Sequence, residues 1–451
     1  MSVQAIDLRN DPISRTFWHY LLPAVSGMLV KAVFLTVDGI FIGQFIGANG
    51  LAALALTAPY FSIFTALSLM VGVGGATLMS SAMGRQDLDK AQSLFAQSMT
   101  LTMVICGAVA GLTLCFLSDI IALSGAQGEI ATMTQDYLGT LLKFSLIYSL
   151  AWVLSCFIRN DTNPKLAMIA MCSGAAINVV FDYLFIVHFG WGIKGAALAT
   201  GLSQVVILVI LLSHFVAQKG RLRFDFLVKK ITDTQHILSI GLPTFFIEVG
   251  RAMTMIAFNY VLLYRYGDHY VSAFGITMTF GLLAIFTMVG VGQACQPIFS
   301  FNVGANRSKR IWETFYLGCK VAFSIGIIMA SITFFSAPLI ATAFIGDEFE
   351  LVQLTSTALR FYFLAAPLMG LNILIATLFQ STGSANKATL LSVGRGFVFV
   401  VAGLFFLPMV VPQQGVWASV VFAEASTLLM GGVWLKKTIQ KEQYMVVGSQ
   451  P

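Results

Sequence analysis

Long stretches without any charged side chain constrain this chain more than any other feature of its sequence. Asp, Glu, Lys and Arg are absent from residues 39–84, 91–118, 195–218, 269–306, 321–346, 361–386 and 396–423. A helix that crosses a bilayer needs about 20 mainly apolar residues, so each stretch can hold one or two such helices. Because a backbone in lipid must satisfy its polar groups internally, and no strand-like alternation is present, we expect an all-α membrane protein.

The composition agrees with lipid as the solvent of this chain. Hydrophobic residues make up 57% of it and charged residues only 10%, whereas soluble domains carry about 25% charged residues. A soluble fold would have to leave much of that apolar area on its own surface. The six cysteines lie in or beside apolar segments without C-x-x-C spacing, so we expect packing residues rather than disulfides or metal ligands.

Twelve membrane spans fit the apolar segments. Their expected ranges are 15–45, 51–82, 92–117, 130–157, 165–188, 195–217, 235–264, 270–302, 311–339, 350–380, 387–410 and 415–436. Basic residues gather in the terminal segments and in the loops at one end of the spans, while the opposite loops hold only Lys194 and Arg265. The positive-inside rule then predicts that both termini are cytoplasmic. This orientation accounts for the net charge of +6, and we expect no nucleic-acid partner.

The second half of the chain repeats the first. Matches occur in order, with offsets between 218 and 222: Leu22-Pro23 with Leu242-Pro243, Met70–Gly74 with Met288–Gly292, Gly84 with Gly304, and Lys165 with Lys387. Both halves begin on the same side of the membrane, so the repeats are parallel, and two six-helix lobes around a cleft form a common transporter plan. The expected divisions are an amino-terminal lobe at 1–218, a cytoplasmic linker at 219–234, a carboxy-terminal lobe at 235–437 and a cytoplasmic tail at 438–451.

Acidic side chains inside the amino-terminal spans are the first functional candidates, because charge within a membrane is costly. At 1.5 Å per residue, Asp38 lies about 10 Å, and Asp182 about 9 Å, from the outer end of its span. Asn178 lies one turn from Asp182 on the same helix face, and Tyr137 and Thr200 have similar depths. These five residues are predicted to share one level of the lobe.

Their chemistry predicts a cation-coupling site. Two carboxylates, an amide and two hydroxyls suit a proton relay, and oxygen ligands suit a hard cation such as Na⁺ equally well. For Na⁺, the expected ligands are Asp38, Asn178 and Asp182. Buried negative charges are costly until a cation neutralises them. The coupling ion and the substrate can therefore shift the equilibrium between two conformations in opposite directions, as antiport requires. No cofactor other than this ion, H⁺ or Na⁺, is expected.

Other charged and kinking residues are secondary candidates. Lys31 and Phe34 share a helix stripe with Asp38, so they are candidates for the substrate cleft, and Pro23 is a candidate hinge because proline removes a helical hydrogen bond. In the second half, Glu248 and Arg251 lie three residues apart, and Arg395 and Glu424 lie on neighbouring spans. Structural ion pairing and a second ion or substrate contact both remain open for these four.

The residues resemble the multidrug and toxic compound extrusion (MATE) family over essentially the whole chain, and its MepA-like bacterial branch is the nearest. The resemblance rests on the segments Asp38–Gly43, Gly50–Ala53, Gly72–Gly74, Asn178–Asp182 and Gly192–Ala197. It implies a V-shaped pair of lobes, rocker-switch alternation, and export of hydrophobic, cationic drugs. It also implies a cation site at Asp38, Tyr137, Asn178, Asp182 and Thr200, bending at Pro23, and a further acidic position at Glu248.

Other functions compete with drug export. A lipid or lipid-linked oligosaccharide flippase of the same superfamily would use a cationic cavity, and a major facilitator transporter also has six plus six spans, although residues 84–90 match its loop motif poorly. An enzyme is not expected, because the histidines show no metal-binding spacing and no Gly-x-Ser-x-Gly elbow is present. We expect a monomer in the bacterial inner membrane whose partners are small organic cations, drugs and membrane lipids.

Overall fold

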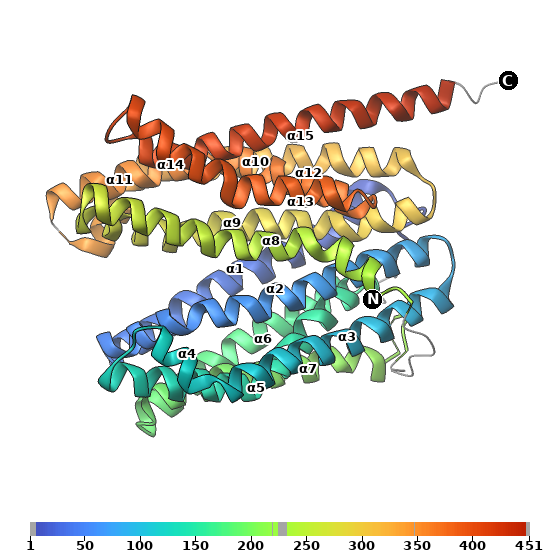
Figure 1. Cartoon of the computed structure of the whole chain (residues 1–451). Coiled ribbons are helices and arrows are strands. Elements are labelled where there is room, and N and C mark those ends of the chain that lie inside the picture. The colour runs from blue at the N-terminus through green and yellow to red at the C-terminus, as the bar shows by residue number, and fades with distance from the viewer. Residues whose placement is uncertain (1–5, 219, 224–231, 347, 448–451) are drawn as a thin grey trace. The chain divides into compact units, whose positions relative to one another are not determined.

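The computed structural model describes residues 6–218, 220–223, 232–346 and 348–447, and Figure 1 shows the order of its helices. Within these residues, twelve helical spans are long and apolar enough to cross a membrane, which confirms the predicted number. The spans of the first half are α1 Ile13–Phe45, α2 Ala48–Gly84, α3 Leu88–Cys115, α5 Gly128–Asn160, α6 Pro164–Asp182 with its extension η1 Tyr183–His188, and α7 Gly192–Val216.

The spans of the second half include two that are assembled from shorter helices. They are α8 Thr234–Tyr266, α9 Asp268–Gly304, α10 Ser308–Ile345, α11 Phe349–Leu364 with α12 Ala366–Ser381, α13 Ala385–Val393 with η2 Gly394–Val398 and α14 Phe399–Val410, and α15 Gly415–Val447. The tenth span breaks between α11 and α12 next to Pro367, which occupies the first turn of α12. Proline is tolerated there because the backbone N–H groups of a first turn have no helical partner.

Most helix ends lie within a few residues of the predicted limits, whereas α15 continues to Val447, beyond its predicted end at 436. Polar side chains outside the apolar core set some of these limits. Asp87 caps α3 by accepting a hydrogen bond from the Lys90 backbone N–H, and Asn163 caps α6 in the same way through Leu166. The short helix α4 (Leu117–Leu123), between α3 and α5, was not predicted. It is too short to cross the membrane.

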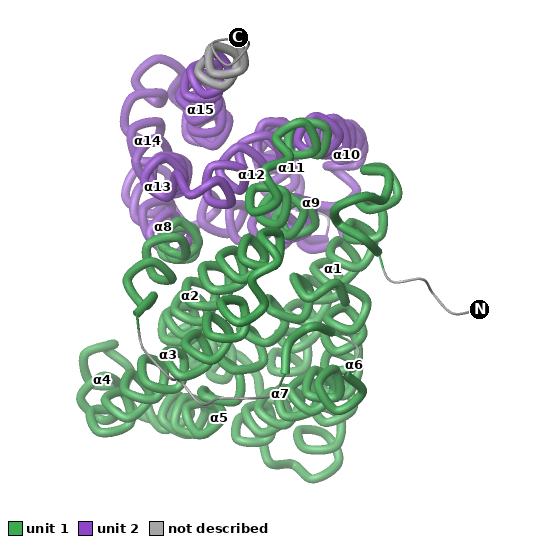
Figure 2. Tube along the Cα trace, turned by 90° about the vertical axis from the view of Figure 1, so that its right-hand side faces the viewer, with its two compact units in different colours: residues 1–249, 293–314 green, residues 250–292, 315–451 purple. Residues whose placement is uncertain are grey.

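Two compact units, coloured separately in Figure 2, divide the chain. Unit 1 comprises residues 1–249 and 293–314, and unit 2 comprises residues 250–292 and 315–451. Unit 1 therefore combines the first six spans with the start of α8, the end of α9 and the start of α10. The lobe limits derived from the sequence repeat stay a prediction, and most of the predicted linker, at 219 and 224–231, lies outside the described residues.

Within unit 1, the ends of α2 and α9 cross so closely that only glycine fits at the contact. A Cβ atom added to Gly84 would collide with the carbonyl oxygen of Phe301, and one added to Gly304 would collide with that of Ser81. Gly84 and Gly304 occupy equivalent positions in the two repeats, and so do Ser81 and Phe301. Each glycine packs against the backbone of the other repeat, which explains why both repeats have glycine at this position.

A buried polar network lies beside this crossing. The Gln296 amide donates to Thr77 Oγ1 at 2.9 Å, and its oxygen accepts from Asn160 Nδ2 at 3.0 Å. Arg159 of α5 donates to the side chain of Gln293. Buried polar groups in lipid need such partners, so this network fixes α2, α5 and α9 in one arrangement.

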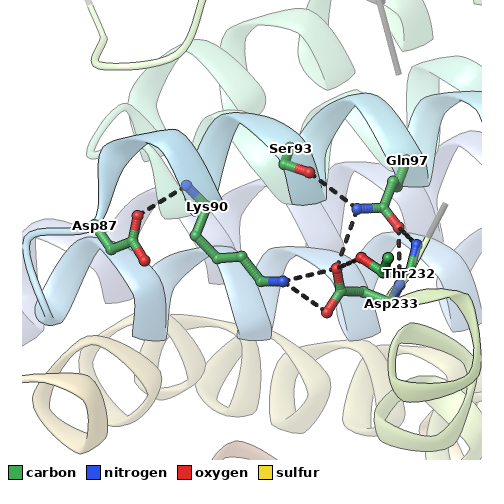
Figure 3. Close-up of polar contacts among 6 residues, drawn as sticks. All are labelled: Asp87, Lys90, Ser93, Gln97, Thr232 and Asp233. Atoms are coloured by element: carbon green, nitrogen blue, oxygen red, sulfur yellow. Dashed lines mark hydrogen bonds and ion pairs between the residues drawn. The ribbon is translucent and has the colours of Figure 1, made fainter. Parts of the chain in front are cut away.

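Polar contacts also hold the segments that lead into α1 and α8. Lys90, at the start of α3, binds Asp233 just before α8, and Gln97 accepts hydrogen bonds from the backbone N–H groups of Thr232 and Asp233 (Figure 3). Arg310, at the start of α10, donates to the backbone carbonyl of Asp11 just before α1 at 2.7 Å. All of these contacts lie inside unit 1.

Unit 2 is held by an aromatic core of its own. Phe258 of α8 and Phe274 of α9 are buried and stack with ring centroids 4.5 Å apart. Trp417 of α15 stacks on Tyr270 at 5.7 Å and belongs to the same buried cluster. Burial of such rings is among the largest apolar contributions that single side chains make.

Candidate cation and substrate site

The five residues predicted for a cation site come from four helices of unit 1. Asp38 lies on α1, Tyr137 on α5, Asn178 and Asp182 on α6, and Thr200 on α7. All five are buried, and Asn178 and Asp182 have no exposed surface. Asp38 and Asp182 are close enough to repel each other electrostatically, and Tyr137 is within reach of both carboxylates. The structure therefore brings the set together, while its role in coupling stays a prediction.

Asn178 joins two members of the set by hydrogen bonds. With its amide oriented to suit both neighbours, its nitrogen donates to Asp182 Oδ2 at 2.8 Å and its oxygen accepts from the Thr200 backbone N–H at 3.3 Å. One turn of helix separates Asn178 from Asp182, which is the spacing that lets two side chains meet on one face. Asn178 thus holds the Asp182 carboxylate next to α7.

The local backbone explains why this carboxylate lies where it does. The helix changes from α to π geometry directly after Asp182, at η1, and π segments often occur at functional sites. Gly195 of α7 lies against Phe185 of η1, where a Cβ atom would come within 3.0 Å of the Phe185 backbone. Gly192 starts α7 with a φ of +55°, which favours glycine. These glycines let α7 approach η1, and Thr200 of α7 lies next to Asn178.

Two buried oxygen atoms of the set have no hydrogen-bond partner among the described residues. They are Oδ1 of Asp38 and Oδ1 of Asp182. Native proteins rarely leave buried polar atoms unsatisfied, and such atoms call for an explanation such as an ion or a proton. The oxygen-only donor set fits H⁺ or a hard cation. Within the described residues no group of three or more His, Cys, Asp or Glu side chains gathers, so amide and hydroxyl oxygens would complete any ion site.

An apolar pocket adjoins this site on the side of Thr200. The space within its limits is about 700 Å³ when the adjoining open space is included. Lys31 and Phe34, predicted for the substrate cleft, both line it, together with Phe61, Tyr148, Trp152 and Thr200. Pro23 is buried inside the unbroken helix α1, and its role as a hinge stays a prediction.

In unit 2, Arg395 and Glu424 form the ion pair that was one of the two predicted alternatives. Arg395 Nε lies 2.6 Å from Glu424 Oε1, and Glu424 is only 4% exposed. Asn372 of α12, which the sequence did not single out, donates to Glu424 Oε2 at 2.7 Å. The only indication of Asn372 in the sequence was that its polar amide lies in the middle of an apolar span. Glu248 belongs to unit 1 and Arg251 to unit 2, so their predicted pairing stays a prediction.

Comparisons with known proteins agree on one family. A family model described as MatE matches residues 23–184 and 243–406. The multidrug export protein MepA of Staphylococcus haemolyticus is 27% identical over 93% of each chain, and MepA of Staphylococcus aureus is 24% identical over 92% of each chain.

Solved structures show the same fold. A MATE in complex with MaL6 gives a TM-score of 0.92 at 23% identity and covers 98% of this chain and 100% of its own. The outward-facing conformation of a multidrug resistance MATE family transporter of the MOP superfamily also gives 0.92 at 23% identity, with coverages of 98% and 99%. A MATE in the bent conformation gives 0.87 at 24% identity, with coverages of 97% and 98%.

Proposed function

This multi-pass membrane protein belongs to the MatE family of transporters and is not an enzyme, and on that premise we propose that it exports hydrophobic, cationic organic compounds by antiport with H⁺ or Na⁺. Two relatives that match more than nine-tenths of this chain are named multidrug export proteins, which supports drugs as the class of substrate. The match to MatE decides against the major facilitator alternative.

The observation that carries this proposal is the pair of buried carboxylates Asp38 and Asp182, each with an unpartnered oxygen among the described residues. Two adjacent negative charges in a low dielectric raise the free energy of the ion-free state. Binding of H⁺ or Na⁺ removes that cost, and so does binding of an organic cation nearby. The two cations therefore compete, and competition at one site is the thermodynamic condition for exchange.

Alternating access follows if the neutralised and the charged site favour different conformations. A charged site favours the state that gives it water or a cationic substrate, whereas a neutral site tolerates closure around it. Asp38 lies on α1, which also carries Pro23, so a change of charge at Asp38 can be transmitted to the bend of the helix. Rocker-switch movement of the two halves would convert this local change into transport.

The charge distribution supports an orientation in the bacterial inner membrane. The loops at 84–90 and 304–310 carry basic residues, and they lie at the same end of the spans as both terminal segments. The positive-inside rule assigns this end to the cytoplasm. The export direction is then from the end that holds the α2–α9 crossing towards the end nearest Asp38. We propose that a single chain suffices for this activity.

Efflux from proteoliposomes tests the function. Protein reconstituted with tetraphenylphosphonium inside the vesicle should export this cation when a proton or a sodium gradient is imposed, and one of the two gradients should suffice. Asp38→Asn should abolish the export that depends on the gradient. Asp136→Asn, which removes a partly exposed carboxylate paired with Lys194, should retain it. Gradient-driven export by Asp38→Asn, or transport of labelled lipid without any organic cation, would contradict the proposal.

A further inference from the structure

A proline in α10 leaves one backbone carbonyl of that helix without its usual donor. Pro338 lies inside α10, and proline has no backbone N–H, so it cannot donate to the carbonyl of residue 334, four positions earlier. Arg360 of α11 supplies the missing bond, because its Nε donates to the Phe334 carbonyl oxygen at 3.1 Å. All three residues belong to unit 2. The proline of one helix therefore sets the position of an arginine on the next.

The guanidinium of Arg360 is fixed at its Nε end and open at the other. Its Cζ lies 5.2 Å from the centroid of the Phe334 ring, and an aromatic face attracts such a cation. Among the described residues, the Phe334 carbonyl is the only hydrogen-bond acceptor of Arg360, and no carboxylate lies within ion-pair distance of it. Arginine carries its donors in a planar fork, so the Nη1 and Nη2 groups can bind a bidentate anion.

Arg360 lies on the face of α11 that points away from the core of unit 2. Gln353, Thr357 and Leu364 share this face, because residues three and four apart are neighbours on a helix. None of these side chains is buried, whereas Tyr362, on the opposite face, is buried. The guanidinium therefore belongs to the outer surface of the unit.

The adjoining surface of α10 is apolar and exposed. Phe335 and Leu339 are 83% and 74% exposed, and α10 has the least buried apolar segment of the twelve described spans. Large apolar side chains exposed together mark a contact with a partner or a membrane. In a chain that spans the bilayer, this surface is in contact with lipid acyl chains.

Helix lengths place Arg360 near the outer boundary of the hydrocarbon. The 38 residues of α10 span about 57 Å, whereas the hydrocarbon is about 30 Å thick, so roughly 13 Å projects at each end of a centred helix. Phe334 lies 11 residues before Ile345, where α10 ends, and Arg360 lies 11 residues after Phe349, where α11 starts. Eleven residues correspond to about 17 Å, so the guanidinium can reach the lipid headgroups, as long basic side chains do near the ends of spans.

We propose that Arg360 binds the phosphate group of an outer-leaflet phospholipid whose acyl chains lie along the exposed face of α10. The phosphate would accept hydrogen bonds from Nη1 and Nη2, and Phe335 and Leu339 would contact the acyl chains. Pro338 is a positioning residue, because the carbonyl that it frees holds Nε. The lipid is a bound partner of unit 2, and the proposal is independent of the export function.

Two lipids with the same acyl chains test the proposal by binding alone. Dioleoylphosphatidylglycerol carries a phosphate and dioleoylglycerol does not. Native mass spectrometry of the full chain, released from a neutral detergent, gives an apparent dissociation constant for the first bound molecule of each. We expect the wild type to bind the phospholipid about tenfold more tightly, as charge-assisted hydrogen bonds predict. Glycerol 3-phosphate, which has the phosphate without acyl chains, should not displace it at equal concentration.

Variants then assign the preference to single residues. Arg360→Gln should weaken the phospholipid by about tenfold and leave dioleoylglycerol unchanged. Pro338→Ala restores a backbone N–H that can bond to the Phe334 carbonyl, so Arg360 keeps its charge but loses its fixed orientation, and phospholipid binding should weaken by a smaller factor. Arg265→Gln is the matched control, because it removes an exposed arginine from the last turn of α8, and it should bind as the wild type does.

Three results would overturn the proposal. The first is a wild type that binds both lipids equally, and the second is a phospholipid affinity that Arg360→Gln leaves unchanged. The third is displacement by glycerol 3-phosphate at equal concentration, which would assign the site to a soluble phosphate compound. If Arg360→Gln cannot be purified, Pro338→Ala decides in its place, and wild-type affinity in that variant would contradict the site as described.

Discussion

Lys90 of α3 and Arg310 of α10 occupy matching positions of the two repeats, and each binds the segment that leads into the first helix of the other half. Lys90 Nζ lies 2.8 Å from both carboxylate oxygens of Asp233, and Arg310 donates to the backbone carbonyl of Asp11 at 2.7 Å. Asp11 and Asp233 also match, at an offset of 222. The contacts are therefore reciprocal, and a single duplicated arrangement accounts for both of them.

The contact between Lys90 and Asp233 should make stability depend on pH. Burial raises the pKa of Asp233, but hydrogen bonds from Lys90, Gln97 and Thr232 outweigh it and hold the pKa below its usual value. A carboxylate with a lowered pKa stabilises the fold above its unfolded pKa, and this contribution is lost as the pH falls through its folded pKa. Because both groups are partly exposed, Lys90→Met should cost only about 0.5–1 kcal/mol near neutral pH.

Thermal unfolding across a range of pH measures this effect. The difference in melting temperature between wild type and Lys90→Met should be constant near neutral pH. It should narrow as the pH falls below about 4, the pKa of an unfolded Asp, and then through the lowered pKa of folded Asp233. Lys309→Met is the matched control, because Lys309 is an exposed basic residue at the start of α10, and its gap should be near zero. A gap that widens as the pH falls would show that the ion pair is not its source.

The crossing of α2 and α9 predicts that Gly84 cannot carry a side chain. Gly84→Ala places a methyl group against the carbonyl oxygen of Phe301, and overpacking of this kind costs about 1–3 kcal/mol. Gly111→Ala is the matched control, because a Cβ atom there meets nothing within 4 Å and alanine favours a helix over glycine. Urea or thermal unfolding should show a loss for Gly84→Ala and none for Gly111→Ala. Equal stability of the two variants would mean that the helices can separate at this point without cost.

The ion pair of unit 2 predicts a strongly non-additive pair of substitutions. Arg395→Met leaves the buried Glu424 charge without its ion partner, and breaking a buried pair from one side costs about 3–5 kcal/mol. The double variant Arg395→Met/Glu424→Gln should recover most of that loss, since no charge is left uncompensated and Gln can still accept from Asn372. A double-mutant cycle on unfolding free energies measures the coupling. If the losses of unfolding free energy in the two single variants simply add in the double variant, Arg395 and Glu424 do not interact, which would contradict the prediction.

The membrane spans were predictable from sequence because lipid imposes one requirement on every segment that crosses it. Each span must be apolar over about 20 residues, so hydropathy alone located α1 and α9 to within a few residues. A rise of 1.5 Å per residue converts position into height, so the sequence could predict that Asp38 and Asp182 lie at one level, and the structure brings their side chains together.

Contacts set by packing could not be predicted in the same way. The π geometry of η1 and η2 depends on neighbouring helices, and nothing in the local sequence specifies it. Asn372 was missed because an isolated amide in an apolar span identifies no partner. Lys90 and Arg310 could have been found, because extending the repeat into the loops aligns them, but their partners lie before α8 and α1 and are distant in sequence.

Counting the ions displaced when a substrate binds tests the central claim most directly. Tetraphenylphosphonium added to purified protein in weakly buffered, sodium-free solution should release protons, or else its affinity should fall as Na⁺ is added. Either signal should disappear in Asp38→Asn/Asp182→Asn and persist in Asp136→Asn. Undiminished proton release or sodium dependence in the double variant would contradict the assignment of the buried carboxylates as the site where substrate and coupling ion compete.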